Sequence, residues 1–203
     1  MDMKNVILAD DDQILHEGLS MLLEKNGFNV VASASSFGDL KELIRSKDVN
    51  HIVCDCKMPG EGPANLLQYC KRFYPNVSVI FLTGLSCGFL FKHLVDCGVS
   101  GLVSKKDSIH SLIECLSAIE QGNTFFSPSA AQCLEKSVIQ LTTKEFQVFE
   151  LIVNGHSNNA IAEILSNSPS TIGRHRENLS RKLQANSIVD LMRIAQQSGM
   201  FDS

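Results

Sequence analysis

The first 120 residues of this 203-residue chain alternate five short apolar runs with amphipathic stretches. We expect strands at the apolar runs, which are residues 5–9, 28–32, 51–55, 77–82 and 99–104. Several of these runs are apolar without alternation, as in strands that are covered on both faces. Strands that alternate with helices form a parallel sheet with right-handed crossovers. The pattern therefore predicts a doubly wound α/β domain with a five-stranded parallel sheet.

From Leu141 onward the pattern is only helical. Each of four predicted helices begins at a residue that can cap it: Thr142, Ser157, Ser168 and Ser187. Thr142 and Glu145 have the spacing of a capping box, and Pro169 suits the first turn of the third helix. Two short helices joined by a tight turn are typical of a helix-turn-helix DNA reader. We expect the α/β domain over 4–121, a linker over 122–136 and this all-α four-helix domain over 137–203.

Composition narrows the class of protein. No apolar run approaches the length of a membrane span, and the N-terminus lacks the pattern of a signal peptide, so we expect a cytoplasmic protein. Seven cysteines, none in a CxxC pair, are interpreted as reduced thiols. Residues 1–136 contain 12 Lys/Arg and 16 Asp/Glu, whereas residues 137–203 contain six of each. Because the helical domain is neutral, one copy should bind DNA weakly and two copies should bind together.

Polar side chains follow the predicted strands at the edge where α/β proteins bind ligands. Asp10 and Asp11 follow the first strand, Asp55 ends the third, Thr83 follows the fourth, and Lys105 follows the fifth. Three carboxylates without a nearby His or Cys ligand suit a hard cation such as Mg²⁺. A bound cation would also offset the repulsion between these carboxylates.

These positions resemble those of a response-regulator receiver domain with a flavodoxin-like fold. Asp55 begins the segment DCKMPG, which matches the D-x-x-M-P-G pattern of that family. The resemblance implies that Asp55 is the phosphoacceptor and that Mg²⁺ is held by Asp11 and Asp55, with Asp10 acting through water. It also implies a metal ligand in the backbone carbonyl of Lys57, and phosphate contacts from Thr83 and Lys105. Leu102 stands where the family often has an aromatic residue that moves on activation.

Residues 137–203 resemble the LuxR-type helix-turn-helix domain, through segments such as Gly155–Asn158, Thr171–Ile172 and Lys182–Leu183. A receiver followed by this domain is the arrangement of the NarL/FixJ class of transcription regulators. Helix periodicity about Ile172 predicts which residues face DNA. Arg174 suits base readout in the major groove. The other predicted DNA-contacting residues are Lys144, Ser170, Thr171, His175, Asn178, Arg181 and Lys182.

The sequence thus predicts a transcription regulator of a two-component phosphorelay, phosphorylated on Asp55 to control dimerisation and promoter binding. The expected partners are double-stranded DNA, a sensor histidine kinase and, in the active state, a second copy of the chain. A face of the last helix with Ile188, Leu191, Met192 and Ala195 is the expected dimer surface. Two alternatives stay open. One is a DNA-binding regulator whose receiver responds without phosphate. The other is a phosphoryl-transfer enzyme, although no substrate pocket or added base is visible beyond what the receiver needs for its own phosphorylation and dephosphorylation.

Overall fold

A computed structural model describes residues 3–198 of the chain. The chain divides into two compact units. Within the described residues, the first unit contains 3–85 and 94–132, and the second contains 86–93 and 133–198. Within the part of the chain that the structure describes, no helix has the length and apolar character to cross a membrane.

The first unit is built on a parallel sheet with the strand order β2-β1-β3-β4-β5-β6. The strands are β1 (Lys4–Ala9), β2 (Phe28–Ala34), β3 (His51–Cys54), β4 (Ser78–Thr83), β5 (Gly101–Ser104) and β6 (Phe125–Phe126). Every residue of β3 and β5 is buried, which explains their uninterrupted apolar sequence. The order changes direction between β1 and β3, so the carboxyl ends of these two strands mark the expected ligand site.

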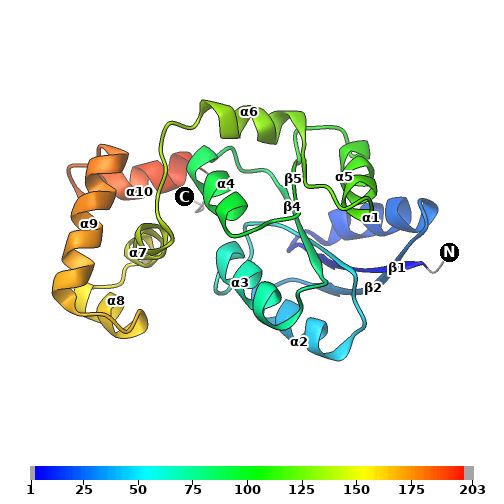
Figure 1. The fold of residues 1–203 in the computed structure, drawn as a ribbon, viewed down its shortest axis with the longest axis horizontal. Helices are drawn as coiled ribbons and strands as arrows, with labels where there is room; N and C mark the ends of the chain where they lie inside the picture. The colour runs from blue at the N-terminus through cyan, green and yellow to red at the C-terminus, as the bar shows by residue number, and fades with distance from the viewer. Residues whose placement is uncertain (1–2, 199–203) are drawn as a thin grey trace. The chain divides into compact units, whose positions relative to one another are not determined.

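Helices cover both faces of this sheet, as Figure 1 shows. Helices α1 (Gln13–Lys25) and α5 (His110–Glu120) pack on the face that carries Val6, Val53 and Val103. Helices α2 (Phe37–Ser46) and α3 (Pro63–Phe73) lie on the opposite face. The doubly wound α/β fold predicted from the sequence is confirmed.

Strand β6 is an element that the sequence pattern did not predict. It has two residues, and it pairs with β5 through Gly101↔Phe125 and Leu102↔Phe126. A strand this short has no periodicity, so its residues fall within the predicted linker over 122–136. Helix α6 (Pro128–Lys136) follows directly.

The second unit contains the four predicted C-terminal helices: α7 (Thr143–Val153), α8 (Asn158–Ile164), α9 (Pro169–Leu183) and α10 (Ile188–Gln197). The predicted caps are present, because each capping side chain accepts a backbone N–H from the first turn of its helix. The capping residues are Thr142, Ser157, Ser168 and Ser187. The capping box of Thr142 and Glu145 is also confirmed. The first residues of helix α4 (Gly88–Asp96) group with this unit, and its last residues with the first unit.

Candidate functional site

Two buried carboxylates lie at the carboxyl edge of the first unit's sheet. Asp10 follows β1 and Asp55 follows β3, and their exposed fractions are only 5% and 7%. Backbone bonds extend the ladder into this edge: Asp55 N–H donates to the Ala9 carbonyl at 2.8 Å, and Asp10 N–H donates to the Ala34 carbonyl at 3.1 Å. These bonds fix the backbones of Asp10 and Asp55 at the same edge of the sheet, so their carboxylates lie close together.

Asp11 completes a group of three carboxylates. One oxygen from each of Asp10, Asp11 and Asp55 lies within 4.8 Å of the others. Asp11 is exposed, so the cluster opens to solvent on its side. A compact set of oxygen donors with three negative charges fits Mg²⁺ and does not fit a metal that needs nitrogen or sulfur ligands.

Lys105 brings a positive charge into the same site. Its Nζ lies 2.7 Å from Oδ2 of Asp10 and 2.7 Å from Oδ2 of Asp55. Burial opposes the charged form of Lys105, but its hydrogen bonds to Asp10 and Asp55 outweigh burial and raise its pKa above the usual value. Lys105 is thus a fixed cation whose two partners are the carboxylates of the site.

Thr83 ends the neighbouring strand β4 and is 1% exposed. Its hydroxyl oxygen accepts the Leu85 N–H at 3.2 Å, and its carbonyl accepts the Lys105 N–H at 2.8 Å. Lys57 lies on the loop after Asp55, where its N–H donates to Oδ1 of Asp55 at 3.1 Å. The loop therefore orients the Asp55 carboxylate, whereas the predicted role of the Lys57 carbonyl as a metal ligand stays a prediction.

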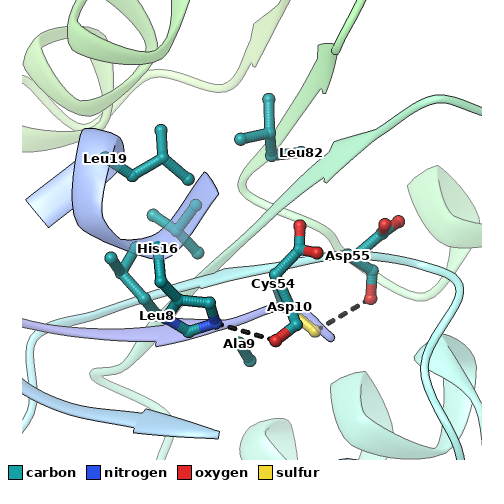
Figure 2. A pocket seen from close by; sticks show the side chains of 9 residues that line it. Leu8, Ala9, Asp10, His16, Leu19, Cys54, Asp55 and Leu82 are labelled. Carbon is teal, nitrogen blue, oxygen red and sulfur yellow. Dashed lines mark hydrogen bonds between the residues drawn. The ribbon is translucent and has the colours of Figure 1, made fainter. Parts of the chain in front are cut away.

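Asp12, the third acidic residue of the run, has a different task from Asp10 and Asp11. Its carboxylate accepts the N–H groups of Ile14 and Leu15 and so caps helix α1. His16 also lies at this site, and its Nε2 is 2.7 Å from the Asp10 carbonyl (Figure 2). A bond to a backbone carbonyl leaves no sequence signal, which explains why this residue was missed.

The interior beneath the carboxylates is almost completely filled. A cavity of about 10 Å³, lined among others by Leu8, Leu19 and Cys54, lies next to Asp10 and Asp55 (Figure 2). This volume holds about one water molecule. The Cys54 thiol donates to the Asp55 carbonyl at 3.0 Å, and burial raises its pKa well above the usual value. The carboxylates are accessible from the side of the exposed Asp11, whereas the interior beneath them is filled. The site therefore suits a small anionic group at its surface and has no room for a larger substrate beneath the carboxylates.

In the second unit, helix α9 presents a polar face to solvent. Ile172, Leu179 and Leu183 are buried, as the periodicity predicted. On the other side Ser170, Arg174 and Arg181 are exposed, and Asn178 and His175 are partly exposed. Among the described residues no hydrogen bond or ion pair involves Arg174, so its guanidinium is available to a ligand.

Several of the other predicted DNA-contacting side chains are already bonded within the unit. The hydroxyls of Ser170 and Thr171 lie 2.9 Å and 2.8 Å from the hydroxyl of the cap Ser168. Arg181 donates to the side-chain oxygen of Asn178 at 2.9 Å. These bonds hold the face in one arrangement, and the assignment of each side chain to DNA stays a prediction.

Helix α10 offers a smaller apolar surface than the sequence indicated. Leu191 and Ala195 are 2% and 0% exposed, so they belong to the core of the unit. Ile188, Val189 and Met192 remain exposed on this helix. The helical period places Ile188, Leu191, Met192 and Ala195 on one face, but packing against α7 and α9 takes the part with Leu191 and Ala195.

Comparison with known proteins assigns both parts of the chain. Residues 6–117 match the family model of the response regulator receiver domain. Residues 139–195 match the family model of bacterial regulatory proteins, luxR family.

Similar proteins extend over almost the full length. The chain is 25% identical over 200 residues to the DNA-binding transcriptional activator EvgA of Escherichia coli K12, covering 96% of this chain and 98% of EvgA. It is 26% identical over 212 residues to the response regulator GacA of Pseudomonas aeruginosa, covering 99% of both. Among solved structures, RcsB from Salmonella enterica serovar Typhimurium, bound to promoter rprA in the presence of the phosphomimetic BeF3-, is similar with a TM-score of 0.79. Its identity is 26%, with coverage of 96% of this chain and 98% of RcsB.

Proposed function

Because the chain belongs to the response regulator receiver family and carries a luxR-type domain after its receiver, we propose that it is a DNA-binding transcription regulator controlled by phosphorylation of Asp55. The observation that carries this proposal is the position of the Asp55 carboxylate. It is buried, lies within a cluster of three carboxylates, and is 2.7 Å from the ammonium of Lys105. This arrangement provides one nucleophilic oxygen and a cation to receive the negative charge of a phosphoryl group.

In the proposed reaction a carboxylate oxygen of Asp55 attacks the phosphorus of the donor. The new bond joins that oxygen to phosphorus, and the bond between phosphorus and the leaving group breaks. With acetyl phosphate as donor, acetate leaves. Lys105 exchanges its contact with the Asp55 carboxylate for one with a phosphoryl oxygen, and the Thr83 hydroxyl donates to another. The receiver catalyses only this transfer and the later hydrolysis, in which water takes the phosphoryl group as inorganic phosphate and the Asp55 carboxylate is restored.

The three carboxylates are the proposed Mg²⁺ ligands, with Asp11 and Asp55 in direct contact, Asp10 through water, and the Lys57 carbonyl completing the set. When bound, the ion neutralises charge that spreads over the phosphoryl oxygens during transfer. The chain's own contribution is orientation, because the Lys57 N–H fixes Oδ1 of Asp55.

The proposed output is binding of double-stranded DNA by helix α9. Arg174 is assigned to base readout. The remaining proposed contacts position the helix on the phosphate backbone: Lys144, Ser170, Thr171, His175, Asn178, Arg181 and Lys182. Two copies, held together when Asp55 is phosphorylated, supply the affinity that one neutral domain lacks. EvgA is named as a DNA-binding transcriptional activator, and RcsB dimers have been solved on DNA, which supports this proposal. A sensor histidine kinase is the proposed phosphoryl source, and the cytoplasm the proposed location.

A second candidate is a DNA-binding regulator that responds without phosphate. The observation in its favour is Leu102, which is fully buried and paired with Phe126, where the family often has a movable aromatic residue. The complete acidic site with Lys105 favours phosphorylation instead.

The direct test of phosphorylation is incubation with acetyl phosphate and Mg²⁺, followed by intact mass measurement. The wild type should gain one phosphoryl group, and the gain should disappear with EDTA and in Asp55→Ala. A wild type that gains no mass, or an Asp55→Ala variant that gains as much, would rule out Asp55 as the acceptor.

A further inference from the structure

The last residue of β5 and the three residues after it form a turn that connects the acidic site with the start of helix α6. We define the Lys105 turn as Ser104–Asp107. Lys105 points from it to Asp10 and Asp55, as described above. The Asp107 N–H donates to the Ser104 carbonyl at 3.0 Å, and the Lys106 N–H donates to the Ser104 hydroxyl at 3.2 Å. The turn is thus closed on itself and anchored by Lys105.

Ser127 holds the same turn from the other side. Ser127 is fully buried, and its hydroxyl oxygen accepts the Ser104 N–H at 2.9 Å. Its own N–H donates to the Leu102 carbonyl at 2.9 Å, which continues the β5–β6 pairing. Its carbonyl accepts the N–H of Ala131 at 2.8 Å and so begins α6. One buried residue therefore bonds to the turn, to β5 and to the first turn of α6.

Asp107 makes a second connection between the turn and the helix. Its Oδ2 accepts the Ser129 N–H at 3.0 Å, and its Oδ1 accepts the Ser129 hydroxyl at 2.5 Å. Burial disfavours the charged carboxylate, but hydrogen bonds from Ser127 and Ser129 outweigh it and lower the pKa of Asp107. The charged form that makes these bonds is therefore present at neutral pH.

We propose that Ser127 and Asp107 couple the Lys105 turn to the start of helix α6. The group that Lys105 binds would then determine the stability of the hydrogen bonds in the first turn of this helix. The proposal deepens the proposed function and rests on it for the signal, because phosphorylation of Asp55 changes the partner of Lys105. It also gives the site a path to the end of the receiver that does not use a movable aromatic residue at position 102. Ser127 and Asp107 are positioning residues, since neither touches the acidic site.

The test is a mutant cycle on the full chain, read by hydrogen exchange at the amides of Ser129 and Ala131. Lys105→Ala removes the anchor of the turn and should speed this exchange by about tenfold, the effect of losing one buried hydrogen bond. In a Ser127→Ala background the same Lys105→Ala change should alter exchange by only about threefold, because one of the two connections is broken and only the Asp107–Ser129 bonds remain. Additive effects, or no effect of Lys105→Ala on these amides, would contradict the coupling.

Two further variants serve as a distant control and as a milder change at the helix start. Ser117→Ala removes a hydroxyl that bonds to the Ile113 carbonyl within α5, away from the turn, and Lys105→Ala should keep its full effect in that background. Ser129→Ala removes only one of the two bonds to Asp107, so it provides a milder variant that tests the coupling even if Ser127→Ala fails to fold, and it should reduce the Lys105→Ala effect in part. A full effect in Ser129→Ala would count against Asp107.

The signal is tested separately with acetyl phosphate and Mg²⁺. Phosphorylation should change the exchange rates of the Ser129 and Ala131 amides in the wild type, and it should change them less in Ser127→Ala. Phosphorylation without any change in the wild type would overturn the proposed path. A wild type that takes up no phosphoryl group would contradict the proposed function, and the Lys105 cycle would still decide the coupling.

Discussion

The Nζ of Lys182 lies 2.6 Å from Oε2 of Glu145, which joins the last turn of helix α9 to the first turn of helix α7. Glu145 is 4% exposed and also accepts the Thr142 N–H at 2.8 Å. One carboxylate therefore completes the capping box and holds a lysine of helix α9. In the absence of DNA, the ammonium of Lys182 is therefore already paired with a carboxylate of its own unit.

This pair predicts a pH-dependent contribution to stability. Burial opposes the charge on Glu145, but bonds from Lys182 and Thr142 outweigh burial and lower its pKa below the usual value. A carboxylate with a lowered pKa in the folded state stabilises the fold above its unfolded pKa, and this stabilisation is lost as the pH falls through the folded value. Glu145→Gln should lower the unfolding free energy by about 1–2 kcal/mol at pH 7 and by less below pH 4.

Urea unfolding of both proteins between pH 7 and pH 3 measures this difference. Glu163→Gln, an exposed change on α8, is the matched control and should follow the wild type. A Glu145→Gln deficit that stays constant over this pH range would contradict the assignment.

Lys105 and a divalent cation should compete for the same carboxylates. The ammonium lies 2.7 Å from both Asp10 and Asp55, so removal of its charge should strengthen cation binding. We expect Lys105→Ala to bind Mg²⁺ about tenfold more tightly, while its phosphorylation by acetyl phosphate becomes slower. Calorimetric titration with Mg²⁺ measures the affinity, with Lys106→Ala as the neighbouring control. An unchanged or weaker affinity in Lys105→Ala would show that the lysine and the ion do not share ligands.

Arg174 and Lys144 should affect DNA binding in different ways. Loss of a guanidinium that reads a base edge costs about 1–3 kcal/mol and relaxes the sequence preference. Arg174→Ala should therefore lose affinity for the selected sequence more than for random DNA. Lys144→Ala should weaken binding to all sequences and reduce the slope of log K against log salt by about one. Equal losses of Arg174→Ala on selected and random DNA would remove Arg174 from base readout.

The exposed side chains of α10 predict the site of pairing. Ile188, Val189 and Met192 are 48%, 68% and 49% exposed, whereas their neighbour Leu191 is buried. A charge in this patch should oppose a contact between two copies, so Met192→Asp should bind a two-site DNA with the affinity expected of single copies. Val138→Asp, at a residue that is 95% exposed outside α10, is the control. Cooperative binding by Met192→Asp would place the dimer contact elsewhere.

Local signals in the sequence were sufficient for most of the fold. The capping residues Thr142, Ser157 and Ser168 and the buried positions of α9 follow from short-range spacing, and the structure confirms them. Asp10, Asp11 and Asp55 converge because parallel strands end at one edge, which the order of elements predicts.

Contacts between distant residues could not be predicted in this way. Ser127 bonds to Ser104 across 23 residues, and Glu145 bonds to Lys182 across 37. No periodicity connects these pairs, and the strand that brings Ser127 to the sheet has only two residues. The burial of Leu191 likewise depends on how α10 packs, because the helical period alone gives both a core face and a dimer face.

The phosphoryl group on Asp55 is proposed to control DNA binding. The most direct measurement is the affinity of the full chain for its selected DNA, with and without acetyl phosphate and Mg²⁺, in wild type, Asp55→Ala and Asp12→Ser. Asp12 caps α1, so a serine there keeps the cap and serves as the matched acidic-run control. We predict that phosphorylation tightens binding about tenfold or more in wild type and Asp12→Ser, and leaves Asp55→Ala unchanged. Equal affinity of phosphorylated and unphosphorylated wild type, or an equal gain in Asp55→Ala, would contradict it.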